Sequence, residues 1–193
     1  MGKKVLYQTL ENQENPDYVE KNGPFPCTSK YAWLGPGFYF WEYFIDNAHW
    51  WGNTVYPGNY FICKASCEFS TETCFDLVGE PKHSEDFDNC LNYLVEHKIL
   101  VLREVTVAKV LQYMKKYVTT FNYKAVRVYG INSVSAKDSR RINFIIPDPQ
   151  HPKSLQYLDM RPAIQLCLFE KRSLSLNDFH IVYPPKYCSE GTI

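Results

Sequence analysis

The sequence predicts a single domain of the α+β class over residues 1–193, and three observations lead to this prediction. Segments with the period-two alternation of a β-strand lie near the start of the chain, between Asn59 and Phe69, and near the end. Two central segments, Ser84 to Val95 and Val105 to Val118, instead repeat apolar residues every three or four positions, as amphipathic helices do. The length of 193 residues is sufficient for one substantial core.

The composition restricts the class of protein. Hydrophobic residues make up 45% and charged residues 22%, as in soluble globular proteins, and the formal net charge is zero. A neutral chain argues against a broad, nonspecific grip on nucleic-acid phosphates. No run reaches the roughly 18 apolar residues of a membrane helix, and the first residues carry no secretory signal. The seven cysteines lie mostly in apolar runs, so we expect reduced thiols, no membrane partner and a cytoplasmic location.

The individual elements follow from local patterns. Glu11 to Lys30 is polar and contains three prolines, which predicts a loop that can fold over a cleft. Asn59 to Phe69 alternates cleanly and predicts a strand with one buried face. Ser84 precedes two acidic residues and is the expected N-cap of the first long helix. Arg127 lies on a strand from Tyr123 to Tyr129, and we expect its side chain to face solvent.

The densest aromatic stretch extends from Leu34 to Trp51. It begins with the turn Gly35-Pro36-Gly37, continues as a short strand, and then repeats Phe44, Ala48 and Trp51 at helical spacing. Periodicity by itself favours a core, because aromatic residues bury large areas. The alternative is a cleft in which the rings enclose a flat heteroaromatic ligand.

Residues 35–40, with the sequence GPGFYF, resemble a motif of the ADP-ribosyltransferases of the diphtheria-toxin and poly(ADP-ribose) polymerase type. In that family a second aromatic residue follows the motif tyrosine by eleven positions, shortly after an alanine. Trp50 has this spacing from Tyr39, and Ala48 takes the place of the alanine. The resemblance implies that Tyr39 and Trp50 stack on the nicotinamide of NAD, with Gly37 beside them in the site.

Two further family positions are altered in this chain. The family's first strand carries a histidine that bonds an NAD ribose, followed by a glycine whose backbone holds the nicotinamide amide. The corresponding residues in the strand from Lys4 to Leu10 are Gln8 and Thr9. The family's glutamate at the start of the second-last strand corresponds to Gln165. The His-Tyr-Glu signature therefore reads Gln8, Tyr39, Gln165, and the resemblance implies Gln165 and Tyr39 as the catalytic positions.

The resemblance implies an α+β, ADP-ribosyltransferase-like fold, with two packed, mainly antiparallel sheets around an NAD cleft and helices outside. It also implies a mono-ADP-ribosyltransferase that uses NAD as co-substrate and a protein or nucleic acid as acceptor. Small stand-alone domains of this kind often act as bacterial toxins or defence effectors, some with a neutralising protein partner. Two alternatives stay open: a weak or inactive module that binds NAD or ADP-ribose, and an NAD glycohydrolase.

Other candidate residues carry less specific patterns. The acidic candidates for a general base are Glu42, Asp46 and Glu170, and His49 lies beside Trp50. Each is also compatible with an ordinary surface position. A zinc set of Cys63, Cys67, Cys74 and His83 lacks any CxxC pair, so we expect no metal.

Overall fold

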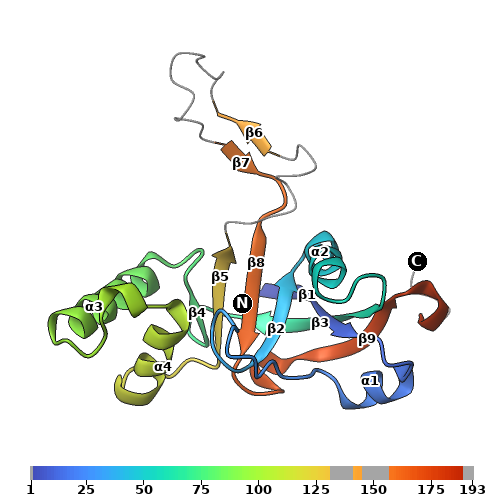
Figure 1. Ribbon diagram of the computed structural model, residues 1–193, viewed down its shortest axis with the longest axis horizontal. Helices are drawn as coiled ribbons and strands as arrows, with labels where there is room; N and C mark the ends of the chain where they lie inside the picture. The colour runs from blue at the N-terminus through green and yellow to red at the C-terminus, as the bar shows by residue number, and fades with distance from the viewer. Residues whose placement is uncertain (1, 131–140, 145–156, 189–193) are drawn as a thin grey trace.

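The computed structural model describes residues 2–130, 141–144 and 157–188. Nine strands and four α-helices make up this part of the chain (Figure 1). The helices are α1 (Pro16–Asn22), α2 (Ile45–Val55), α3 (Pro81–Glu96) and α4 (Val107–Tyr117). The strands are β1 (Gly2–Glu11), β2 (Phe38–Glu42), β3 (Tyr60–Phe69), β4 (Cys74–Asp76), β5 (Ala125–Gly130), β6 (Arg141–Asn143), β7 (Tyr157–Asp159), β8 (Ala163–Leu168) and β9 (Asn177–Tyr183). Short 3₁₀ turns lie at Leu102–Glu104, Ser173–Ser175 and Pro185–Tyr187.

Seven strands form one mixed sheet in the order β4-β5-β8-β2-β1-β3-β9. Every neighbouring pair is antiparallel except β4 and β5. The two halves of this sheet are joined at β1 and β2, which pair at two positions, Leu6 with Glu42 and Tyr7 with Trp41. In Figure 1, β1, β3 and β9 run across the direction of β2 and β8. The α+β class is therefore confirmed, although the two expected sheets are joined as one.

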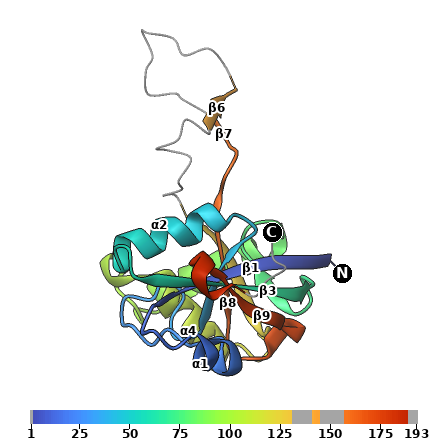
Figure 2. The same ribbon diagram turned by 90° about the vertical axis from the view of Figure 1, so that its right-hand side faces the viewer.

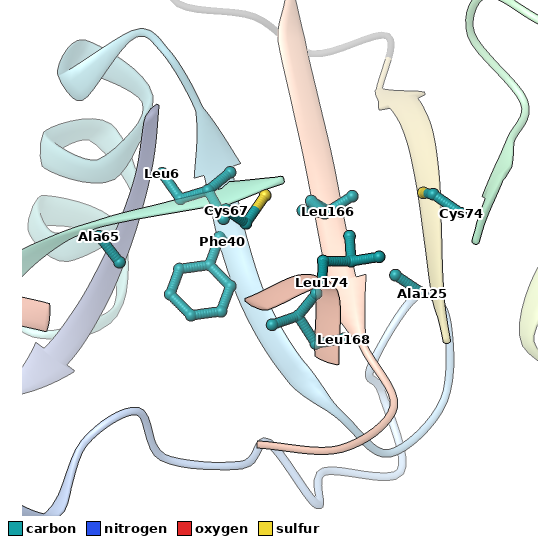
Figure 3. Packing of buried hydrophobic residues seen from close by; sticks show 9 residues of the cluster. All are labelled: Leu6, Phe40, Ala65, Cys67, Cys74, Ala125, Leu166, Leu168 and Leu174. Carbon is teal, nitrogen blue, oxygen red and sulfur yellow. The ribbon is translucent and has the colours of Figure 1, made fainter. Parts of the chain in front are cut away.

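The core lies where the two halves of the sheet face each other. Phe40 of β2 and Leu166 of β8 belong to one buried cluster with Leu6 of β1 and Cys67 of β3 (Figure 3). Each of these side chains is at most 1% exposed. Because both halves contribute apolar faces to this layer, the sheet encloses its own core without needing a helix on that side.

The helices cover the remaining faces. Helices α3 and α4 pack over the outer face of β4, β5 and β8, in a cluster that includes Leu94, Met114 and Val126. Helix α2 covers Trp41 together with residues of β3, and α1 covers Ile181 of β9. The described helices include none that is long and apolar enough to cross a membrane.

A two-stranded ribbon of β6 and β7 extends away from the main body in both views (Figures 1 and 2). It connects directly to the start of β8, the strand that carries Gln165. Ile142 pairs with Leu158, and both side chains are exposed. The ribbon therefore adds little to the main core.

Three local predictions are wrong for identifiable reasons. Residues 11–30 contain helix α1, which begins at Pro16, a residue favoured in a first helical turn. Helix α3 begins at Pro81 with Glu80 as its N-cap, so Ser84 lies inside the helix. Strand β3 is a strand as expected, but it is buried on both faces over most of its length, because α2 packs against the face of Tyr60 and Ile62 and α1 packs against the opposite face, at Phe61 and Cys63. Alternation within one strand does not reveal what covers its second face.

Candidate functional site

A cavity of about 360 Å³ lies beside the junction of β1, β2 and β8. Gln8, Thr9, Tyr39 and Gln165 all line it, although they lie far apart along the sequence. Most of the remaining lining is aromatic: Phe25, Tyr31, Trp33, Phe40, Trp41, Trp51 and Tyr56. Every described residue of the lining is uncharged. The cavity therefore suits a flat, neutral group that makes a few hydrogen bonds.

The turn before β2 fixes the ring of Tyr39. The Tyr39 hydroxyl accepts a hydrogen bond from the Leu34 N–H at 2.8 Å and donates one to the Gly35 carbonyl at 2.6 Å. Gly35 has a φ of 83°, a left-handed conformation that glycine adopts without strain. Burial, and then the nearby Cys167 thiol, raises the pKa of Tyr39 well above its ordinary value. Tyr39 is thus a neutral, oriented aromatic wall and not a base at ordinary pH.

Gln8 holds the covering segment over the cavity. Its Nε2 donates to the Phe25 carbonyl at 2.8 Å and to the Tyr39 carbonyl at 3.3 Å, and its Oε1 accepts from the Phe25 N–H at 2.9 Å. The side chain is 4% exposed. Both the oxygen and the nitrogen of the Gln8 amide have protein partners, so Gln8 positions Phe25, a residue that lines the cavity. Gln8 could bond a ligand only if it gave up one of these hydrogen bonds.

Gln165 differs from Gln8 in its hydrogen bonding. It is 8% exposed, lies opposite Trp41 on β2, and lines the cavity. Its Oε1 is buried and has no hydrogen-bond partner among the residues that the structure describes. A buried amide oxygen without a donor costs free energy, about 1–3 kcal/mol. A ligand that offers a hydroxyl or N–H group would recover that energy.

Thr9 and Gly37 shape the site without offering free groups to it. The Thr9 hydroxyl donates to the Ala48 carbonyl of α2 at 2.9 Å, which ties the helix to β1. Gly37 does not line the cavity itself, but its backbone forms an antiparallel bridge with Cys27, which does. A Cβ at Gly37 would come within 2.4 Å of Cys167 Sγ and 2.7 Å of the Leu168 carbonyl oxygen. The motif glycine is therefore needed for the close approach of β8.

Trp51, and not Trp50, lines the cavity. The Trp50 ring packs edge-on against Trp41, with centroids 5.9 Å apart, and lies 6.1 Å from Trp51. The structure thus brings Gln8, Thr9, Tyr39 and Gln165 together, and it places Trp50 behind the rings that face the cavity.

Trp33 and Trp41 are lining residues that the motif reasoning missed. Their rings meet edge to face, with centroids 6.4 Å apart. The signal for Trp41 was in the strand itself, because residues two apart on a strand share a face and Tyr39 was already assigned to the site. Trp33 had no comparable signal, since it comes from the loop before the motif.

The prediction for Arg127 is wrong, because its side chain is buried. It is 9% exposed and lies between two carboxylates. Its Nε donates to Glu42 at 2.6 Å, and its Nη1 donates to Asp76 at 2.9 Å. Lys4 adds a further contact to Glu42 at 2.7 Å. This network joins β1, β2, β4 and β5, so Glu42 supports the sheet and does not face the cavity.

The other titratable candidates lie outside the lining. Asp46 pairs with Arg161, and Glu170 does not line the cavity. His49 Nδ1 lies 3.0 Å from the Tyr60 hydroxyl, and burial lowers the pKa of His49. His83 Nδ1 accepts from the Asp76 N–H at 2.9 Å. Among the described residues, no group of three or more His, Cys, Asp or Glu side chains could hold a metal ion.

Comparisons of the chain with protein-family models, with curated proteins and with solved structures found no match. The function must therefore be inferred from the geometry of the cavity and from the motif in the sequence.

Proposed function

We propose that the protein is a mono-ADP-ribosyltransferase that binds the nicotinamide end of NAD in this cavity and transfers ADP-ribose to a macromolecular acceptor. One observation carries the proposal. The three positions matched to the His-Tyr-Glu signature, Gln8, Tyr39 and Gln165, come from three strands and line one aromatic cavity. The ADP-ribosyltransferase-like fold is part of the same proposal, supported by the adjacency of those strands, β1, β2 and β8.

The size and charge of the cavity indicate which part of NAD it would hold. A volume of about 360 Å³ is near the lower end of the range for small-molecule sites, about 300–1,000 Å³. The neutral aromatic lining suits a nicotinamide ring and its ribose, whereas a diphosphate needs cationic partners. Lys30 is exposed, and its Nζ lies 5.0 Å from the ring centroid of Tyr31, a lining residue. Lys30 is therefore our candidate for meeting the diphosphate outside the cavity.

Gln165 would hold a ribose hydroxyl through its unpaired Oε1. Cleavage of the nicotinamide–ribose bond develops positive charge on the ribose, and an oriented dipole stabilises that charge less than a carboxylate does. We therefore expect slow turnover. In the family that the motif resembles, a carboxylate in the site is associated with the elongation of ADP-ribose chains. Every described lining residue is uncharged, so we expect a single transfer to each acceptor site.

The same lining supports a second candidate, a module that binds NAD or ADP-ribose without turnover. The specific observation is again Gln165, an amide at the position where the resemblance implies a carboxylate. The two candidates differ in nicotinamide release and not in binding, so one assay series separates them.

The test is nicotinamide release from NAD by the purified protein, with and without cell lysate, beside NAD-induced thermal stabilisation. Tyr39→Ala removes the ring, and Tyr39→Phe keeps the ring as the matched control. Base stacking contributes about 1–3 kcal/mol, so Tyr39→Ala should weaken NAD binding roughly 5- to 150-fold beyond Tyr39→Phe. Gln165→Glu should raise the release rate by about one to three powers of ten.

The outcomes separate the alternatives. Release that requires lysate, and is lost in Tyr39→Ala, supports the transferase. Release without lysate would indicate a glycohydrolase. Stabilisation by NAD without release, in the wild type and in Gln165→Glu, would indicate the binding module. If the protein shows no nicotinamide release and no stabilisation by NAD, the assignment of the cavity to NAD is refuted.

A further inference from the structure

A second cavity, of about 540 Å³, lies between α3 and α4 and is also lined by Phe75 of β4 and by the segment that connects α4 to β5. It contains none of the residues that line the NAD site. Six aromatic side chains line it: Phe75, Tyr93, Tyr113, Tyr117, Phe121 and Tyr123. Phe75, Phe121 and Tyr123 pack against one another with centroids 5.1 Å apart, and the Tyr113 centroid lies 4.8 Å from that of Tyr117, so the wall of the cavity is a continuous aromatic surface.

The polar side of this cavity is negative. Asp86 of α3 is the one charged side chain among the described residues that line it. Its Oδ1 accepts from Lys82 at 2.9 Å at the exposed surface. Burial, and after it the charges of Asp86 and Glu80, raises the pKa of the Tyr123 hydroxyl. The charge of Asp86 therefore acts on Tyr123, and that phenol stays neutral at ordinary pH.

We propose that this cavity binds an organic cation of the quaternary ammonium type. The faces of aromatic rings carry negative potential and attract cations within about 6 Å of the ring centroid, and a nearby carboxylate adds to that attraction. An anionic ligand would meet Asp86 and the negative ring faces. A purely apolar ligand would gain nothing from the negative potential of the rings or from Asp86, whose present ion pair with Lys82 lies at the exposed surface.

The chain's own lysine shows that a ring at the edge of the cavity is accessible to a cation. Lys116 Nζ lies 5.0 Å from the centroid of Tyr117, although Lys116 itself is exposed and does not line the cavity. Tyr117 is 58% exposed, so a ligand can approach its ring from solvent. A ligand cation with methyl groups would lose less hydration than an ammonium does, and would gain more from the rings.

The first experiment compares choline with 3,3-dimethyl-1-butanol, its uncharged isostere, by titration into the full-length ¹⁵N-labelled protein. Amide shifts in α3 and α4 report the binding. We expect choline to bind about tenfold more tightly than the isostere, since the two differ in charge and not in shape. Equal affinities, or no shifts with choline, would overturn the proposal.

Two variants with matched controls locate the site. Asp86→Asn removes the charge, and Asp88→Asn removes an equivalent charge from the same helix outside the lining. Tyr117→Leu removes a lining ring, and Tyr18→Leu removes one of similar exposure, 56%, from α1. We expect each cavity variant to weaken choline binding about 3- to 10-fold and each control to leave it unchanged. Equal loss in variant and control would place the binding elsewhere and refute the site.

The cation can come from a free metabolite or from a protein side chain, and a second arm separates these sources. A short peptide with trimethyllysine is compared with choline under the same conditions. Tighter binding of the peptide indicates a protein source, and equal binding indicates recognition of the ammonium group alone. Both results support the cation site, which is independent of NAD binding.

Discussion

Replacing Gln8 with leucine tests whether its amide holds the segment that covers the candidate NAD site. Leucine has a similar volume, so the change removes hydrogen bonds without leaving a large cavity. Three contacts are lost: two with the backbone of Phe25, at 2.8 and 2.9 Å, and one with the Tyr39 carbonyl at 3.3 Å. At about 1 kcal/mol for each, with some rehydration at the half-buried Phe25, we expect about 2–3 kcal/mol of lost stability. For a chain of this length this lowers Tm by about 4–12 °C.

Chemical denaturation measures this loss, and hydrogen exchange at the Phe25 amide measures local release. Gln13→Leu is the matched control, because Gln13 is exposed and bonds Glu11 at the surface. The control should change stability by at most about 0.5 kcal/mol. If Gln8→Leu unfolds with the wild-type free energy and the Phe25 amide stays protected, the reasoning about the amide is wrong.

Three further predictions concern stability. Gly37→Ala should cost about 1–3 kcal/mol in urea unfolding, because its Cβ would overlap Cys167 Sγ; Gly2→Ala, which meets nothing, should be neutral. Arg127→Ala removes the cation beside the buried Asp76 carboxylate and leaves Glu42 paired with Lys4 alone, so it should cost about 3–5 kcal/mol, whereas exposed Arg103→Ala should cost little. Burial raises the pKa of Cys167 to about 12, so its contribution to folding is complete below pH 9 and declines as pH rises from 9 towards 12; unchanged stability across that range would contradict this.

Much of the secondary structure could be predicted from local patterns. The alternation of β3 and the apolar stripe of α4 depend on side chains that repeat with the period of the element itself. The aromatic motif also singles out Tyr39, which lines the cavity, because its spacing from the turn is encoded locally. The sequence does not predict helix α1, because a helix of seven residues, about two turns, carries too few periodic residues to exceed the signal of three prolines.

The burial of charge could not be predicted in the same way. Arg127 is polar in sequence and was expected in solvent, yet carboxylates from β2 and β4 surround it. Those partners, Glu42 and Asp76, are 85 and 51 residues away along the chain. Pairing across such separations depends on strand order, which no local pattern specifies.

The sequence by itself determined the α+β class, the aromatic strand with Tyr39, and the positions of Gln8 and Gln165 near the start and end of the chain. Only the tertiary structure decided that these residues share a cavity, that Trp51 and not Trp50 faces it, and that Gln8 is paired while Gln165 Oε1 is buried without a described partner. The physical reason is that periodicity reports the face of one element, whereas a cavity depends on which faces of distant elements meet and on which polar groups find partners there.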